Sequence, residues 1–443
     1  MKTTYTYAQI VKVAYPIFLM MLVQNLIQVI DTAFLGHVGE IELGASAIGG
    51  IYYIAMFTVA FGFSTGAQIL MGRRNGEKKF NQIGEIFLFG TAFLWIIALF
   101  IFFFTRWSSE RVLAKMLHSP HVLTASIEFL NWRIGGLFFA CINVMFRAFF
   151  VGIIRTKVLT FNAICMALTN VFFDYTLIFG NWGFPKMGIS GAALASVFAE
   201  AVSTCFFIVY LLLSVDLKKF GFTGIVWRNF RVIRNILNVS TSLMIQNFLS
   251  LSTWFLFFLM IERMGEATLA ISNIIRSFYM IFAIHIFALS STSSTLVSNT
   301  IGSGKSNEVI ALIWKIARLA LAISLILVII LFLFPEPILR IYTSDPELIQ
   351  ASIPSLHVIL AVLLTLSVGN IFFQSISGTG NTRSALMIEC STLFIYIFWI
   401  WFATIHLQAP LAVCWIAEWI YAFLLALLSF IYFRYAKWQN KKI

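Results

Sequence analysis

The chain has 443 residues, of which 60% are hydrophobic and only 11% are charged, and its mean hydropathy is +0.92. An ordinary soluble domain carries about 25% charged residues, so this composition excludes a soluble globular protein and indicates burial in lipid. The net charge of +12 then indicates basic loops on one side of a membrane, and not a nucleic-acid partner.

Twelve apolar segments follow one another along the chain. A helix needs about 20 such residues to cross a bilayer. The first segment is too long for a cleavable signal peptide, and no small-residue cleavage site follows it. The pattern predicts an all-α integral membrane protein with helices at about 13–35, 45–71, 83–105, 124–153, 157–179, 188–214, 236–261, 267–298, 308–334, 349–377, 383–407 and 409–435.

Lysine and arginine are concentrated in the loops that follow even-numbered segments. The loop after the second segment holds Arg73, Arg74, Lys78 and Lys79, for example, and both termini are also basic. Because cytoplasmic loops carry the excess of positive charge, we expect these loops and both termini in the cytoplasm of a multi-pass protein of the cell inner membrane.

The two halves of the chain resemble each other. Gly39-Glu40 recurs as Gly265-Glu266, and Gly152 with Thr156 recurs as Gly378 with Thr382, each time 226 positions later. Gln24-Asn25 recurs as Gln246-Asn247 after 222 positions. Six helices per half make the repeat parallel, an arrangement found in transporters. We therefore expect an N-terminal lobe at 1–215, a cytoplasmic linker at 216–235 and a C-terminal lobe at 236–443.

Several motifs carry a resemblance to a known family. They are Gly62-Phe-Ser-Thr-Gly-Ala-Gln68, Gly152-x3-Thr156-Lys157, Asn170-Val-Phe-Phe-Asp174 and the glycine-rich stretch from Gly183 to Ser196. With them the chain resembles the multidrug and toxic compound extrusion (MATE) transporters, in particular the bacterial NorM/DinF-like branch. A proline that the family often has after the Gly-x3-Thr loop is absent here. The resemblance implies a V-shaped bundle of two six-helix lobes.

Carboxylates inside the predicted helices point to a cation site. From helix geometry, Asp31 lies about 27 Å and Asp174 about 25 Å above the cytoplasmic side, and Asn170 shares a helix face with Asp174. Ser196 lies about 12 Å below the outer face. Low dielectric and mutual repulsion let one of two such acids hold a proton, and the same oxygens suit Na⁺. The resemblance implies that Asp31, Asn170 and Asp174 form the cation site, with Ser196 where a threonine is usual.

The second half lacks these acids. The repeat places Asp31 on Thr253, Asn170 on Tyr396 and Asp174 on Ile400. Structural needs alone would act alike in both halves, so the asymmetry favours a dedicated coupling site in the first half.

Other intramembrane groups are candidates for coupling or gating. Pro16 is expected to kink the first helix, either as a hinge coupled to Asp31 or as a static bend. Glu200 and Glu418 occupy nearly equivalent positions in the last helix of each half, which favours a shared structural or gating role. Glu389 could pair with Arg383.

The expected substrate cavity lies between the halves. Its candidate lining residues are Asn25, Gln28, Gln68, Gln246, Asn247, Trp254, Asn273, Asn370 and Gln374. Arg147 and Arg276 are basic residues inside helices that could pair with an acid or favour an anionic ligand.

The sequence favours a secondary antiporter that exports amphipathic, mostly cationic drugs or toxic compounds against H⁺ or Na⁺. The alternative is a flippase of a lipid-linked precursor from the same wider superfamily, which the buried acids disfavour. No catalytic triad, phosphate loop or metal-ligand spacing occurs, so we expect no enzyme, no cofactor and no metal beyond Na⁺. We expect a monomer whose partners are the bilayer and small molecules.

Overall fold

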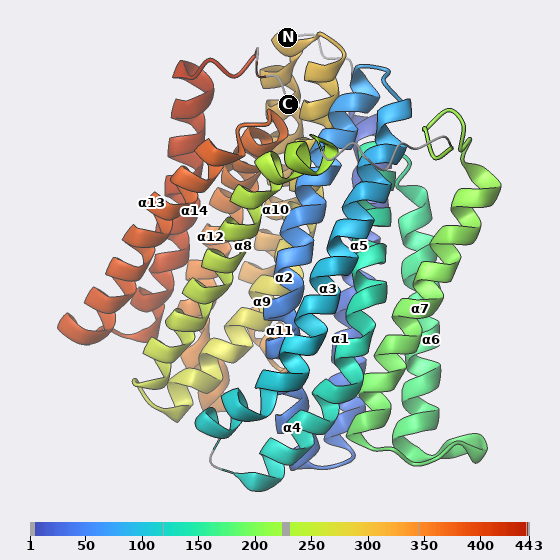
Figure 1. Cartoon of the computed structure of the whole chain (residues 1–443). Helices are drawn as coiled ribbons and strands as arrows, with labels where there is room; N and C mark the ends of the chain where they lie inside the picture. Colours follow the sequence, from blue (N-terminus) through green and yellow to red (C-terminus); the bar gives the residue numbers. More distant parts are fainter. Residues whose placement is uncertain (1–4, 118, 224–230, 344, 440, 442–443) are drawn as a thin grey trace. The chain divides into compact units, whose positions relative to one another are not determined.

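The structure is a computed structural model, which describes residues 5–117, 119–223, 231–343, 345–439 and 441 (Figure 1). Parts of two predictions, residues 224–230 of the linker and the basic residues Lys2 and Lys442 of the termini, lie outside the described residues.

The described residues form helices, and twelve of these segments are long and apolar enough to cross a membrane. The prediction of an all-helical protein with twelve spans is therefore confirmed. The spans are α1 (Tyr7–Gly36), α2 (Glu40–Gly76), α3 (Asn81–Met116), α4 with η1 and α5 (Pro120–Gly152), α6 (Lys157–Phe179), α7 (Ile189–Ser214), α8 (Arg231–Glu262), α9 (Glu266–Gly302), η3 with α10 (Ser306–Leu333), α12 (Pro346–Gly378), α13 with η4 (Thr382–His406) and α14 (Leu411–Tyr435).

The internal repeat is visible in the helix boundaries. The helices α2 and α9 both have 37 residues, and both follow a glycine, Gly39 or Gly265. The helices α5 and α12 end at Gly152 and Gly378. These pairs keep the 226-residue offset, so the second half reproduces these helix boundaries of the first.

One span differs between the halves. The predicted helix at 124–153 is broken into α4 (Pro120–Arg133), the 3-10 turn η1 (Ile134–Gly136) and α5 (Leu137–Gly152). Its counterpart α12 continues unbroken over 33 residues. The break falls at Gly135-Gly136, where the lack of side chains weakens the helix.

The chain packs as two compact units. We call Leu19–Met244 the N-terminal unit, and Met1–Phe18 with Ile245–Ile443 the C-terminal unit. The helices α1 and α8 therefore each contribute residues to both units. The lobe division at 216–235 stays a prediction.

In the N-terminal unit, α6 and α7 run side by side (Figure 1). A Cβ atom on Gly191 of α7 would lie 2.7 Å from the carbonyl oxygen of Leu177 on α6, so only glycine permits this approach. Gly180 ends α6 in the left-handed conformation, with φ of 75°, which glycine adopts without strain. The close packing holds Asp174, near the end of α6, in a buried position.

In the C-terminal unit, α12 packs against α9, α10 and α14 (Figure 1). A Cβ atom on Gly369 would lie 2.7 Å from the Ala422 carbonyl oxygen, which explains the tight α12–α14 contact. An aromatic cluster fills the core of this unit and includes Phe257, Tyr279, Tyr396 and Trp415. Two buried glutamates lie on the helices that build this cluster.

Candidate coupling-ion site

Asp31, Asn170 and Asp174 meet in the N-terminal unit, as the sequence predicts. Asp31 is half-buried on α1, whereas Asn170 and Asp174 are 1% and 0% exposed on α6. In the orientation that satisfies its amide, Asn170 Nδ2 donates to Asp31 Oδ1 at 2.9 Å and to Asp174 Oδ2 at 3.2 Å. One amide therefore ties the carboxyl groups of two helices together.

The two carboxyl groups also hydrogen-bond to each other. Two ionised carboxylates cannot make such a contact, because neither has a hydrogen to donate. A proton held by one of them supplies that hydrogen and removes the repulsion. The Oδ1 atom of Asp174 is buried and accepts no hydrogen bond from a donor among the described residues.

Ser196 is half-buried on α7 and makes no hydrogen bond within the described parts of the chain. Its expected depth places it lower than the two aspartates, and depth along a helix does not specify which way a side chain faces. The structure thus joins three of the four residues predicted for the cation site.

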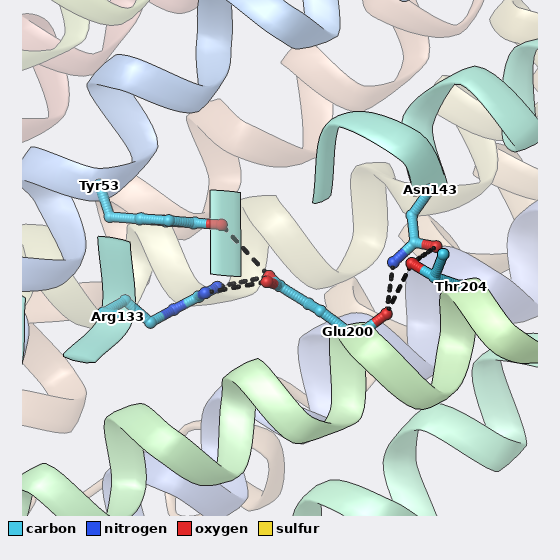
Figure 2. A network of polar contacts seen from close by, with 5 residues as sticks. All are labelled: Tyr53, Arg133, Asn143, Glu200 and Thr204. Atoms are coloured by element: carbon cyan, nitrogen blue, oxygen red, sulfur yellow. Dashed lines mark hydrogen bonds and ion pairs between the residues drawn. The ribbon is translucent and has the colours of Figure 1, made fainter. Parts of the chain in front are cut away.

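A second polar cluster surrounds Glu200 of α7 (Figure 2). Arg133, at the end of α4, approaches it through two hydrogen bonds, Nη2 to Oε1 at 2.7 Å and Nη1 to Oε2 at 3.1 Å. The Tyr53 hydroxyl donates to Oε1 at 3.2 Å, and the guanidinium lies 3.7 Å from the centre of the Tyr53 ring. Glu200 is therefore the acid of a bidentate buried ion pair.

The α4–η1–α5 break makes room for this pair. A Cβ atom on Gly136 would clash with Glu200 Oε2 and would lie 2.6 Å from Arg133 Nη1. A residue of α5 also holds the backbone of α7 at Glu200: Asn143 Nδ2 donates to the Glu200 carbonyl oxygen at 2.9 Å (Figure 2).

Arg133 is the charged residue of this cluster that the sequence reasoning missed. It lies inside the predicted span 124–153, so its charge at that depth was a usable signal. Arg133 also interacts electrostatically with Asp31. The arginine thus connects the Glu200 cluster with the aspartate pair.

The two other arginines considered from the sequence stack on phenylalanine rings. Arg147 lies 4.8 Å from the centre of the Phe61 ring, and Arg276 lies 4.9 Å from that of Phe258. Neither forms an ion pair with an acid of the described residues.

The glutamates of the C-terminal unit are held by neutral donors. Glu418 accepts hydrogen bonds from Trp254 and Tyr396, both at 2.9 Å. Glu389 accepts from Ser250 and Tyr421. The expected pair of Glu389 with Arg383 is wrong for the described structure, since the carboxyl group turns into the core, where it is 1% exposed.

Pro16 lies inside α1, which continues through it as one helix. Two residues after Pro16, between Phe18 and Leu19, α1 passes from the C-terminal unit into the N-terminal unit. Asp31 lies on the same helix in the N-terminal unit.

The candidate cavity residues divide between the units. Asn25, Gln28 and Gln68 belong to the N-terminal unit, and the C-terminal unit holds Gln246, Asn247, Trp254, Asn273, Asn370 and Gln374. Asn25 and Asn273 each donate to a carbonyl oxygen one turn earlier in their own helix, at 3.1 Å. A cavity lined by these residues stays a prediction.

The profile of the MatE family matches residues 16–176 and again residues 242–402. The chain belongs to the MATE family. The two matched stretches begin 226 residues apart, the offset of the internal repeat. As a MATE transporter, the protein is a multi-pass membrane protein that moves small molecules, and it is not an enzyme.

Relatives cover most of this MATE transporter. A protein of Thermotoga maritima described as a probable multidrug resistance protein NorM is 24% identical over 439 residues, which is 98% of this chain and 94% of the relative. A Bacillus subtilis protein of the same description is 21% identical and covers 77% of this chain and 76% of its own.

Solved structures share the fold. A eukaryotic MATE transporter superposes with a TM-score of 0.88 at 16% identity, covering 98% of this chain and 96% of its own. A transporter of Pyrococcus furiosus superposes with a TM-score of 0.87 at 17% identity, covering 96% and 94%, and its description reports a binding pocket of reversed polarity.

Proposed function

We propose that this MATE transporter is an antiporter that exports amphipathic, mostly cationic compounds in exchange for an inward-moving cation bound at Asp31 and Asp174. The observation that carries the proposal is the hydrogen-bonded pair of carboxyl groups bridged by Asn170. The multidrug description of the NorM relatives supports the substrate class. The basic loops and termini support an inner-membrane protein with both termini in the cytoplasm, and we propose that it acts as a monomer.

We propose H⁺ as the coupling ion. When the Asn170 amide is assigned from its hydrogen bonds, its nitrogen faces both acids, and a nitrogen that donates hydrogen bonds cannot ligate Na⁺. A sodium site would need the amide oxygen on that side, because hard cations prefer oxygen ligands. The hydrogen bond between the carboxyl groups of Asp31 and Asp174 needs one hydrogen, and a bound proton supplies it.

Coupling follows from charge. A proton on the pair and a cationic substrate nearby disfavour each other, so each lowers the affinity of the site for the other by the same factor. Arg133 interacts with Asp31 and carries a permanent charge, which opposes a second positive charge. We further propose that Pro16 bends α1 as the protonation of Asp31 changes.

The test is uptake of a fluorescent cationic dye into inverted membrane vesicles. The lumen is acidified in one arm and loaded with Na⁺ in the other. Asp31→Asn and Asp174→Asn are compared with wild type, and Glu262→Gln, an exposed acid at the end of α8, is the matched control. Coupled transport is expected to fall by about 5- to 150-fold in the aspartate variants, the usual range of coupling between sites.

Three outcomes contradict parts of the proposal. Uptake driven only by Na⁺ overturns the choice of ion, and undiminished coupled uptake in Asp31→Asn overturns the site. If neither gradient moves dye in wild type, the antiporter proposal fails, and flipping of a lipid-linked precursor is tested next in proteoliposomes.

A further inference from the structure

Glu389 of α13 is a buried carboxyl group whose two oxygens have unequal surroundings. The residue is 1% exposed. Its Oε1 accepts from Ser250 Oγ at 2.5 Å and from the Tyr421 hydroxyl at 3.0 Å. Its Oε2 is buried and has no hydrogen-bond partner among the described residues. A carboxylate carries negative charge on both oxygens, so a bare buried Oε2 is costly for the ionised form.

Counting hydrogens at Ser250 points to one more proton. The hydroxyl has a single hydrogen, yet two acceptors lie within reach: Glu389 Oε1 and, at 3.0 Å, the main-chain oxygen of Gln246. If Glu389 is protonated on Oε1, its own hydrogen goes to Ser250 Oγ, and the serine hydrogen goes to Gln246. Both contacts are then hydrogen bonds, and Oε2 becomes the carbonyl oxygen of a neutral acid.

The surroundings provide no cation for an ionised Glu389. The ion pairs among the described residues involve Glu77, Glu200 and Glu308, and neither Glu389 nor Glu418. The segment of α8 that faces Glu389 contributes Ser250 but no titratable residue. In α12, the centre of the His357 ring lies 5.4 Å from that of Phe332, with the two rings tilted by 40°. Tyr421 of α14 contacts Glu389, and the groups that interact electrostatically with Tyr421 are acids or phenols: Glu418 on α14, Tyr396 on α13 and Tyr279 on α9.

Glu418 differs in the number of its donors. It accepts from Trp254 Nε1, from the Tyr396 hydroxyl and from Tyr279. Three donors favour the ionised form of a carboxyl group. Glu418 is therefore the better stabilised carboxylate of the two, and Glu389 is the glutamate that a proton neutralises more readily.

We infer that Glu389 is a proton-binding site of the C-terminal unit, with the proton on Oε1 and donated to Ser250. Its release to water leaves a carboxylate and turns the Ser250 hydroxyl from the Gln246 carbonyl oxygen to Glu389. The inference goes beyond the proposed function, which places the coupling site in the N-terminal unit.

Infrared difference spectroscopy of the purified full-length transporter tests this directly. The protein is kept at neutral pH in a detergent without ester groups, so that the carbonyl stretch of a protonated acid is visible. Transport is not measured, so the result is independent of the antiporter proposal. Variants are compared with wild type after equal elution on size-exclusion chromatography shows that they are folded.

The expected result is loss of one protonated-acid band in Glu389→Gln, a band that shifts on exchange into D₂O. Ser250→Ala, which changes no charge, should move the same band to higher frequency because a hydrogen bond is lost. Glu418→Gln, the matched control, should keep the band and lose carboxylate absorption instead.

The inference is overturned if Glu389→Gln removes only carboxylate absorption, or if Glu418→Gln removes the acid band. It is also overturned if replacing choline by Na⁺ at constant pH removes the band, since the ligand would then be sodium. If Glu389→Gln does not fold, an unchanged band in Ser250→Ala overturns the inference.

Discussion

Two positions of the internal repeat hold a tyrosine beside a buried glutamate, yet the two glutamates are stabilised differently. Tyr53 donates to Glu200 in the N-terminal unit, and Tyr279, 226 residues later, donates to Glu418 in the C-terminal unit. In the first unit Arg133 completes a bidentate ion pair. The equivalent position of the second unit is Ile359, which is 1% exposed in the apolar core.

The difference shows how one scaffold accommodates buried acids with and without a cation. In the N-terminal unit the Arg133 guanidinium compensates Glu200 and also interacts electrostatically with Asp31, so one cation acts on two acids. In the C-terminal unit phenol, indole and serine donors replace the cation, which leaves Glu389 to be neutralised by a proton. Asn170 and Tyr396 are equivalent positions of the repeat. Asn170 donates hydrogen bonds to Asp31 and Asp174 in its unit, and Tyr396 donates one to Glu418 in the other.

The strongest test of the comparison removes the cation. Arg133→Met leaves Glu200 buried without its partner, which should lower the free energy of unfolding by about 3–5 kcal/mol. The double variant Arg133→Met with Glu200→Met should regain most of that loss, because a buried pair replaced by apolar residues is often nearly neutral. Thermal unfolding in detergent measures both. If Arg133→Met were as stable as wild type, the Arg133 guanidinium would not be required to stabilise the buried Glu200 carboxylate.

A smaller effect is expected from crowding the same pair. Gly136→Ala puts a methyl group against Glu200 and Arg133, and overpacking typically costs about 1–3 kcal/mol. Gly135→Ala is the matched control, because a Cβ atom there meets no atom within 4 Å. Equal unfolding temperatures for the two variants would show that the Arg133–Glu200 ion pair is not tightly packed against Gly136.

Two tyrosine substitutions compare the acids directly. Tyr396→Phe removes a donor from Glu418, which has no cation, and should cost about 1.5–3 kcal/mol, as for hydrogen bonds to charged groups. Tyr53→Phe leaves both Arg133 contacts in place and should cost only about 0.5–1.5 kcal/mol. The reverse order in unfolding experiments would contradict the view that neutral donors carry the charge of Glu418.

The smallest effect is expected at Ser196. Because it makes no hydrogen bond within the described residues, Ser196→Ala should change stability by less than about 0.5 kcal/mol. Dye uptake driven by a proton gradient should match wild type. A loss of coupling comparable to that of Asp31→Asn would return Ser196 to the cation site predicted from the sequence.

Much of this transporter follows from the sequence alone. Apolar length determines the twelve spans, because a helix that crosses lipid needs a minimum run of hydrophobic residues. The constant offset of recurring glycines predicts the repeat that the helix boundaries display. The intramembrane positions of Asp31, Asn170 and Asp174 indicated a common depth, since rise per residue is fixed in a helix.

Tertiary structure decided which side chains meet. Depth does not specify how a helix is rotated or how closely it approaches its neighbour, so the sequence joined Ser196 to the aspartates and suggested Arg383 as a partner for Glu389. Packing instead turns Glu389 towards Ser250 and Tyr421. The break at Gly135-Gly136 brings Arg133 to Glu200, a contact between residues 67 positions apart that no local pattern encodes.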